Sequence, residues 1–127
     1  MRATVGTLGL LLAAGTAAAA VKTKEIEYDH DGTKLKGVLV FDDAGTGKRP
    51  GVLVFPEWWG LNDYAKKRAA MLAEQGYVAF AADMYGEGKV TDHPEDARKM
   101  ATAVRMNQAQ WLGRAVLQLQ HNVADSY

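Results

Sequence analysis

Glu57 is the strongest candidate for a catalytic or ligand-binding side chain, because it directly follows the apolar run Gly51–Pro56. A continuous apolar run is typical of a strand buried on both faces, and open α/β sheets bind ligands just beyond the carboxyl ends of their strands. The residues that follow, Trp58 to Gly60, suit an apolar pocket around the carboxylate. From residue types alone, an exposed loop acid beside two packing tryptophans explains the segment equally well.

Side chains that act as covalent nucleophiles are nearly absent. The chain has no Cys, and its only Ser is Ser126, one residue from the end. The absence of Cys also excludes disulfide bonds and cysteine zinc sites. Because covalent hydrolysis of the common kind attacks with a Ser or Cys side chain, such a nucleophile has almost no candidate among these residues.

Two short motifs that resemble ligand sites have simpler explanations. Asp29-His30-Asp31 falls at a predicted hairpin turn, where such residues bond to the turn backbone and to solvent. Gly45-Thr46-Gly47-Lys48 lacks the first glycine and the final Ser or Thr of a phosphate-binding loop, since Asp42 and Arg49 stand at those places. We therefore expect no metal and no cofactor.

Charge and hydropathy limit the partners and the location. The 15 Lys and Arg residues balance the 15 Asp and Glu residues, which argues against a nucleic acid partner, because phosphate binding needs a basic excess.

Residues 1–20 carry one charge, Arg2, followed by an apolar centre at Val5–Ala14 and an Ala18-Ala19-Ala20 end. This pattern predicts a cleaved signal peptide and export to the periplasm or the medium. The alternative is a membrane anchor, but the apolar centre is shorter than the ~20 residues of a spanning helix, so we expect no stable anchor.

Residues 21–127 are enough for one small domain. Their patterning predicts a hairpin, a strand, a helix, a strand and two helices, and the strand–helix–strand order implies parallel pairing with a crossover. We expect the hairpin at Glu25–Tyr28 and Leu35–Phe41 around an Asp31-Gly32 turn, strands at Gly51–Pro56 and Tyr77–Ala82, and helices from Asn62 to Gln75, from Pro94 after a His93 cap, and from Gln108 to Ala124. This order describes an α/β fold whose sheet is incomplete.

The last predicted helix carries an apolar stripe at helical spacing. We expect its buried side to hold Trp111, Ala115, Val116, Leu119 and Val123. Its polar side is expected to hold Arg114, Gln118, His121 and Asp125. His121 is therefore predicted to be a surface residue.

Three segments together resemble the dienelactone hydrolase family of α/β-hydrolases: Pro50–Asn62, Ala73–Ala79 and Ala82–Gly86. The resemblance covers most of residues 23–125. Its most specific part is the E-x-x-G-x-N segment that begins at Glu57, which precedes a D-x-Y-G loop by about 20 residues.

The resemblance implies the N-terminal part of an α/β-hydrolase fold and an enzyme that cleaves esters or lactones. The family attacks with a Cys or Ser on a sharp strand-to-helix turn, followed along the chain by Asp and His. Ser126 lacks the flanking glycines of such a turn, and His30, His93 and His121 all precede any nucleophile. We therefore expect residues 21–127 to be truncated before the nucleophile elbow, with nucleophile, acid and base beyond residue 127, and to be inactive alone.

Two site elements implied by the resemblance do fall within the chain. Glu57 matches the family's glutamate, which contacts the nucleophile and helps to activate it. The backbone N–H of Trp58 matches one donor of the oxyanion hole. The family's original enzymes hold the substrate carboxylate with an arginine just after the D-x-Y segment, where this sequence has Glu87. The departure indicates a more general small-molecule ester or lactone as the substrate.

The same residues also fit a complete, small, non-catalytic α/β domain that binds a ligand or partner through Glu57–Gly60. The reading frame discriminates between the two hypotheses. A stop codon after Tyr127 favours the binding domain, and continued coding into G-x-C-x-G or G-x-S-x-G favours the hydrolase. The oligomeric state is left open by the sequence.

Overall fold

The computed structural model describes residues 20–45 and 47–124, with side chains as far as Leu117. Within these residues the strands are β1 (Val21–His30), β2 (Thr33–Asp42), β3 (Gly51–Val54) and β4 (Val78–Ala81), and the helices are α1 (Asp63–Glu74), α2 (Pro94–Met106) and α3 (Gln108–Ala124). The predicted signal peptide, apart from Ala20, and Ser126 lie outside the described residues.

The first two strands form the predicted hairpin. β1 and β2 pair antiparallel along their whole length. The turn residues Asp31 and Gly32 have φ of +51° and +73°, the left-handed conformation that a type I′ hairpin turn requires at both positions. The Asp29 carboxylate accepts a hydrogen bond from the Gly32 N–H at 3.0 Å. The acidic residues here therefore stabilise a turn, as predicted.

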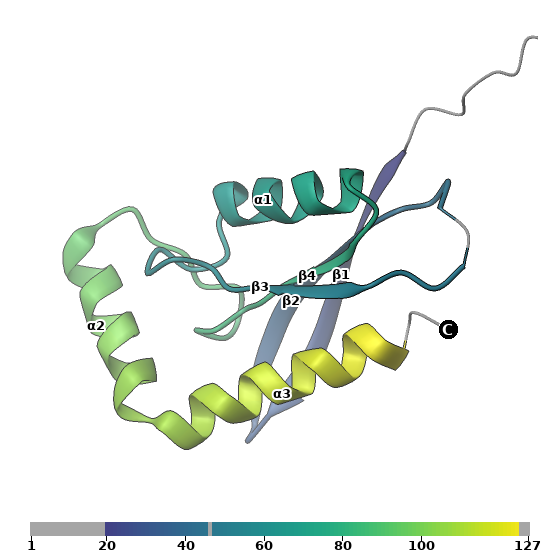
Figure 1. The fold of residues 1–127 in the computed structure, drawn as a ribbon. Helices are drawn as coiled ribbons and strands as arrows, with labels where there is room; N and C mark the ends of the chain where they lie inside the picture. Colours follow the sequence, from purple (N-terminus) through teal and green to yellow (C-terminus); the bar gives the residue numbers. More distant parts are fainter. Residues whose placement is uncertain (1–19, 46, 125–127) are drawn as a thin grey trace, which may run out of the picture.

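The four strands form one sheet in the order β1-β2-β4-β3. β4 pairs antiparallel with β2 and parallel with β3, so β3, α1 and β4 form the predicted parallel crossover. Figure 1 shows α1 on one face of the sheet and α3 on the other. The expected α/β class, with a hairpin followed by parallel strands and helices, is confirmed.

Alternating side chains of β4 supply both halves of the core. Ala79 and Ala81 face α1 in one cluster, with Val38, Val40, Leu61, Ala65, Ala69 and Ala73. Val78 and Phe80 belong to the opposite cluster, with Tyr28, Leu35 and Leu39. The small alanines let α1 approach the sheet closely, while the Phe80 ring fills the space over Gly37, where a Cβ would collide with it.

The helix boundaries follow the predicted capping signals. Asn62 caps α1, its side-chain oxygen accepting the Ala65 N–H at 3.1 Å, and Gly76 follows the helix with a φ of +92°. α2 begins at Pro94 after His93, although the His93 side chain makes no capping hydrogen bond. None of the described helices is long and apolar enough to cross a bilayer.

β3 is less buried than predicted. We expected a strand buried on both faces, but its first residue is exposed and the other three are half-buried, whereas all four residues of β4 are buried. The reason is position, because β3 is the outermost strand of the described sheet and pairs with β4 alone.

The predicted orientation of α3 is wrong over its first turns. Trp111 is 40% exposed and Val116 is 51% exposed, whereas Arg114, expected on the polar side, is 4% exposed. Ala115 is buried as predicted. The side chains of the later stripe and polar residues, among them Leu119, Val123, Gln118, His121 and Asp125, lie outside the described part.

Candidate functional site

The segment Glu57–Gly60, hereafter the β3 loop, forms a tight turn after β3, from which Phe55 and Pro56 separate it, because the strand ends at Val54 and not at Pro56 as predicted. The Gly60 N–H donates to the Glu57 carbonyl at 3.2 Å. Gly60 has a φ of +86°, and a Cβ there would collide with the Lys89 carbonyl oxygen. The loop is therefore packed against the chain just before α2, at a point where only glycine fits.

The segment Asp83–Gly88, hereafter the β4 loop, is organised around one buried carboxylate. Asp83 accepts backbone N–H groups from Lys36 at 3.0 Å, Tyr85 at 3.1 Å, Gly86 at 2.8 Å and Gly88 at 2.9 Å. Hydrogen bonds to a charged acceptor are stronger than neutral ones. The sequence resemblance included this loop but assigned Asp83 no role; the acid followed closely by two glycines is the signal that could have revealed it.

Tyr85 joins the two loops. Its hydroxyl donates to the Trp58 carbonyl oxygen at 2.7 Å. Burial raises the pKa of the Tyr85 phenol, so the phenol keeps its proton at neutral pH and remains a donor. A side chain from the end of β4 thus holds the backbone at the end of β3.

Arg114 supports the β4 loop from α3. Its guanidinium is buried and donates to the Met84 carbonyl oxygen. Burial lowers the pKa of Arg114, and the nearby Asp83 and Asp31 oppose that shift. This internal hydrogen bond is the reason that Arg114 faces inward, and helical spacing alone gave no sign of it.

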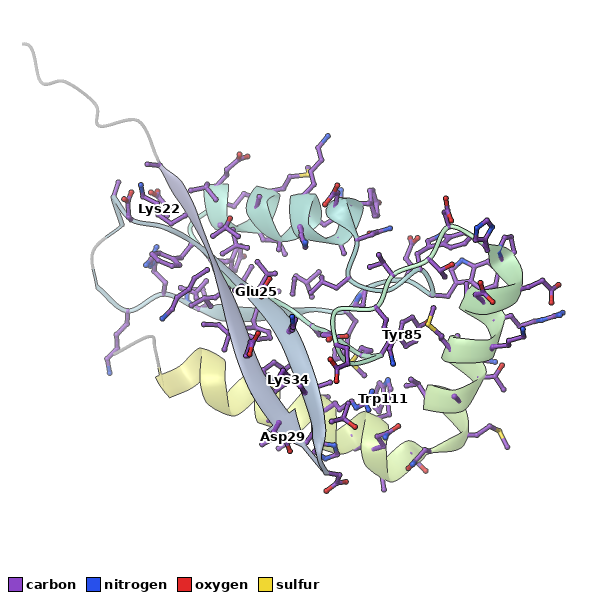
Figure 2. All side chains as sticks on the ribbon, turned by 180° about the vertical axis from the view of Figure 1, so that it is seen from behind. Lys22, Glu25, Asp29, Lys34, Tyr85 and Trp111 are labelled. Carbon is purple, nitrogen blue, oxygen red and sulfur yellow. The ribbon has the colours of Figure 1, made fainter. Side chains whose placement is uncertain are left out.

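A cavity of about 660 Å³ lies against both loops and the junction of α2 with α3, within the range of small-molecule sites. Its aromatic lining comes from Phe55, Trp58, Tyr85 and Trp111. The Phe55 and Trp111 rings are stacked, with centroids 6.1 Å apart. In Figure 2, Tyr85 and Trp111 lie between the sheet and α2. The exposed side of Trp111 therefore belongs to the wall of a cavity.

Glu57 lies at the border of this cavity. The structure places it also beside a smaller space of about 220 Å³ that Tyr64 and Arg68 help to line. Its side chain is exposed, and among the described residues its carboxylate has no hydrogen bond or ion pair. The carboxylate is therefore available to a group that enters from either side.

The Trp58 N–H, the other predicted site group, also has no acceptor in the described part of the chain. Its indole is 41% exposed and contacts Trp59, the two rings lying 4.8 Å apart. The structure thus brings Glu57 and Trp58 to the same cavity.

A second charged residue of the cavity lining was not predicted. Arg105 of α2 lines the cavity, and it is the one cationic residue among the described lining. Glu87, the residue near the family's arginine position, is exposed, has a φ of +57° and does not line the cavity. Arg105 is far from the loops in sequence, so only the packing of α2 reveals its place.

In the described residues, no group of three or more His, Asp or Glu side chains is arranged to hold a metal ion.

Known proteins resemble this chain in sequence and in fold. The sequence model of the dienelactone hydrolase family matches residues 35–126. Protein usf of Aquifex pyrophilus is 40% identical over 80 residues, which make up 61% of this chain and 33% of that protein. The chain therefore spans about a third of the length of this relative.

Solved structures match over a longer range. The structure named m3DLH has a TM-score of 0.79 and 41% sequence identity, covering 84% of this chain and 45% of its own. A dienelactone hydrolase-like promiscuous phosphotriesterase from metagenomic libraries has a TM-score of 0.78 and 36% identity, covering 84% and 44%. The chain spans less than half of each of these proteins.

Proposed function

Because the chain belongs to the dienelactone hydrolase family, we propose that it is the N-terminal portion of a longer hydrolase that cleaves carboxylic ester or lactone bonds by nucleophilic catalysis. The observation that carries the proposal is that one cavity of small-molecule size holds a carboxylate, Glu57, and a backbone donor, the Trp58 N–H, neither of which has a partner among the described residues. An acid and a donor at the end of a parallel strand suit acyl transfer.

In this proposal the chain supplies two parts of the reaction. Glu57 contacts the nucleophile, a Cys or Ser beyond Tyr127, and helps to activate it. The nucleophile attacks the carbonyl carbon, and the Trp58 N–H stabilises the oxyanion that forms. A His beyond Tyr127, oriented by an Asp that also lies beyond it, takes the proton of the nucleophile and gives it to the departing alcohol oxygen. The His then deprotonates the water that hydrolyses the acyl-enzyme.

The substrate is a small molecule with an ester or lactone bond. The aromatic lining from Phe55, Trp58, Tyr85 and Trp111 favours an apolar body. Glu87 stands near the point where the family's original enzymes have an arginine, which supports a substrate other than a dienelactone. No cofactor, nucleic acid or metal enters this proposal.

The test begins with the gene. Its coding sequence is read past Tyr127, and the product, hereafter the longer protein, is assayed with an activated aryl ester and a simple lactone. We expect a strand followed by G-x-C-x-G or G-x-S-x-G, and turnover that disappears when that Cys or Ser is replaced by Ala. A stop codon directly after Tyr127 would instead support the non-catalytic binding domain.

The 127-residue chain provides the matched control. We expect no turnover of the same ester, because it has no Cys and its only Ser is Ser126. Turnover by the chain that disappears in Ser126→Ala would contradict a nucleophile beyond residue 127.

A further inference from the structure

The Trp58 N–H belongs to the peptide unit that begins at the Glu57 carbonyl, and the Trp58 carbonyl begins the next unit. A trans peptide holds a carbonyl and the next N–H in one plane, pointing in opposite directions, and the described residues contain no cis peptide bond. The Gly60 N–H bonds to the Glu57 carbonyl, which fixes the plane before Trp58. The Tyr85 hydroxyl bonds to the Trp58 carbonyl, which fixes the plane after it. Together these bonds restrict both peptide units, and thereby φ and ψ of Trp58, which join them.

The two bonds differ in origin. The bond from Gly60 is internal to the turn and moves with it. The bond from Tyr85 comes from the β4 loop, which four N–H bonds to Asp83 hold in place. A second external bond, from the Thr91 N–H to the Trp59 carbonyl at 3.0 Å, holds the following residue. Tyr85 is therefore the side chain that anchors the Trp58 peptide to the sheet.

We propose that Tyr85 is a positioning residue, whose hydroxyl aims the Trp58 N–H at the developing oxyanion by holding the Trp58 carbonyl. The inference rests on the proposed function for its chemical consequence, since that function makes the Trp58 N–H an oxyanion donor. Preorganised donors are effective because they need not reorient during the reaction. Because the Tyr85 hydroxyl already donates to the Trp58 carbonyl, it acts on the reaction through that carbonyl and not by contact with the substrate.

Tyr85→Phe isolates the hydroxyl. The half-buried ring keeps its place in the cavity wall, so substrate contacts of the ring are retained. Removing an oxyanion donor outright costs about 10²–10³ in kcat, so a donor that is present but loosely held is expected to cost about tenfold. We expect kcat of the longer protein for the aryl ester to fall about tenfold while KM changes less than twofold.

Amide hydrogen exchange gives a readout that needs no activity. In Tyr85→Phe, the Gly60 and Thr91 N–H groups are expected to exchange at least tenfold faster, because both bond to carbonyls of the β3 loop. The Val78 N–H, bonded to the Pro50 carbonyl at the other end of the strands, is the internal reference and should not change. If the reading frame ends at Tyr127, the same exchange experiment is performed on this chain.

Two further variants complete the test. Tyr77→Phe removes a hydroxyl that makes no hydrogen bond among the described residues, and it should change neither kcat nor exchange. Tyr85→p-aminophenylalanine keeps the ring and an N–H donor, and it should restore both. Unchanged exchange at Gly60 and Thr91 in Tyr85→Phe, or a raised KM at constant kcat, would overturn the proposal. Absence of esterase activity in the wild-type longer protein would contradict the proposed function. The amide exchange rates would still decide whether Tyr85 holds Trp58.

Discussion

The carboxylate of Asp83 ties the end of β4 to β2 by accepting the backbone N–H of Lys36 at 3.0 Å. The two residues are 47 positions apart in sequence, yet the same carboxylate also holds its own loop through Tyr85, Gly86 and Gly88. One buried side chain thereby joins the hairpin to the loop that lines the cavity.

Removal of this carboxylate should destabilise the fold strongly. Asp83→Ala removes a residue that is 1% exposed and leaves four backbone N–H groups without their acceptor, one from a buried hydrogen bond and three from partly buried ones. Each unsatisfied buried donor costs about 1–3 kcal/mol, and water reaches some of them as the loop relaxes, so we expect a loss of about 3 kcal/mol in the free energy of unfolding. Urea denaturation of the longer protein measures it.

Asp29→Ala is the matched control. Asp29 also accepts a backbone N–H, from Gly32, but in an exposed turn, where water replaces the lost acceptor. Its cost should stay below about 1 kcal/mol. Equal losses in the two variants would show that burial of Asp83 does not determine its contribution.

Glu57→Gln should slow ester hydrolysis by the longer protein. The amide keeps the size of the side chain but removes the charge that the proposed function uses on the nucleophile. We expect the rate constant to fall tenfold or more, which is on the order of 1.4 kcal/mol. Glu74→Gln, at the exposed end of α1, is the control and should leave the rate unchanged. An unchanged rate in Glu57→Gln would show that Glu57 is an exposed loop acid without a role in the reaction.

The outer edge of β3 should make the isolated segment Val21–Tyr127 associate with itself or remain partly unfolded. In the described residues β3 pairs with β4 on one side only, and an unprotected strand edge recruits other chains. Light scattering after gel filtration should show higher oligomers for this segment and a smaller, uniform species for the longer protein. A monomeric segment that unfolds cooperatively would contradict the expectation.

Export is a further proposal, based on Arg2, the apolar centre and the Ala18-Ala19-Ala20 end. We expect mass spectrometry of the mature protein, purified from its native host, to find Val21 at the N-terminus and the protein in the periplasm or the medium. Recovery of the intact N-terminus from the cytosol would count against it.

Local patterns were sufficient for much of the fold. The Asp31-Gly32 turn, the Asn62 cap and Gly76 could be predicted because each acts on neighbouring backbone atoms through a conformation or hydrogen bond that the residue type itself favours. The position of Glu57 beyond the end of a strand likewise followed from the apolar run before it, although the strand itself stops at Val54.

Tertiary structure decided which distant groups meet. Helical spacing predicted Arg114 on a polar face and Trp111 on a buried one. In the structure the Arg114 guanidinium donates a hydrogen bond to the buried Met84 carbonyl, and Trp111 stacks on Phe55 at a cavity. Arg105 reaches the same cavity only through the packing of α2. Periodicity reports hydrophobicity along one element, whereas a buried hydrogen bond between elements depends on which polar atoms the assembled fold leaves to be satisfied.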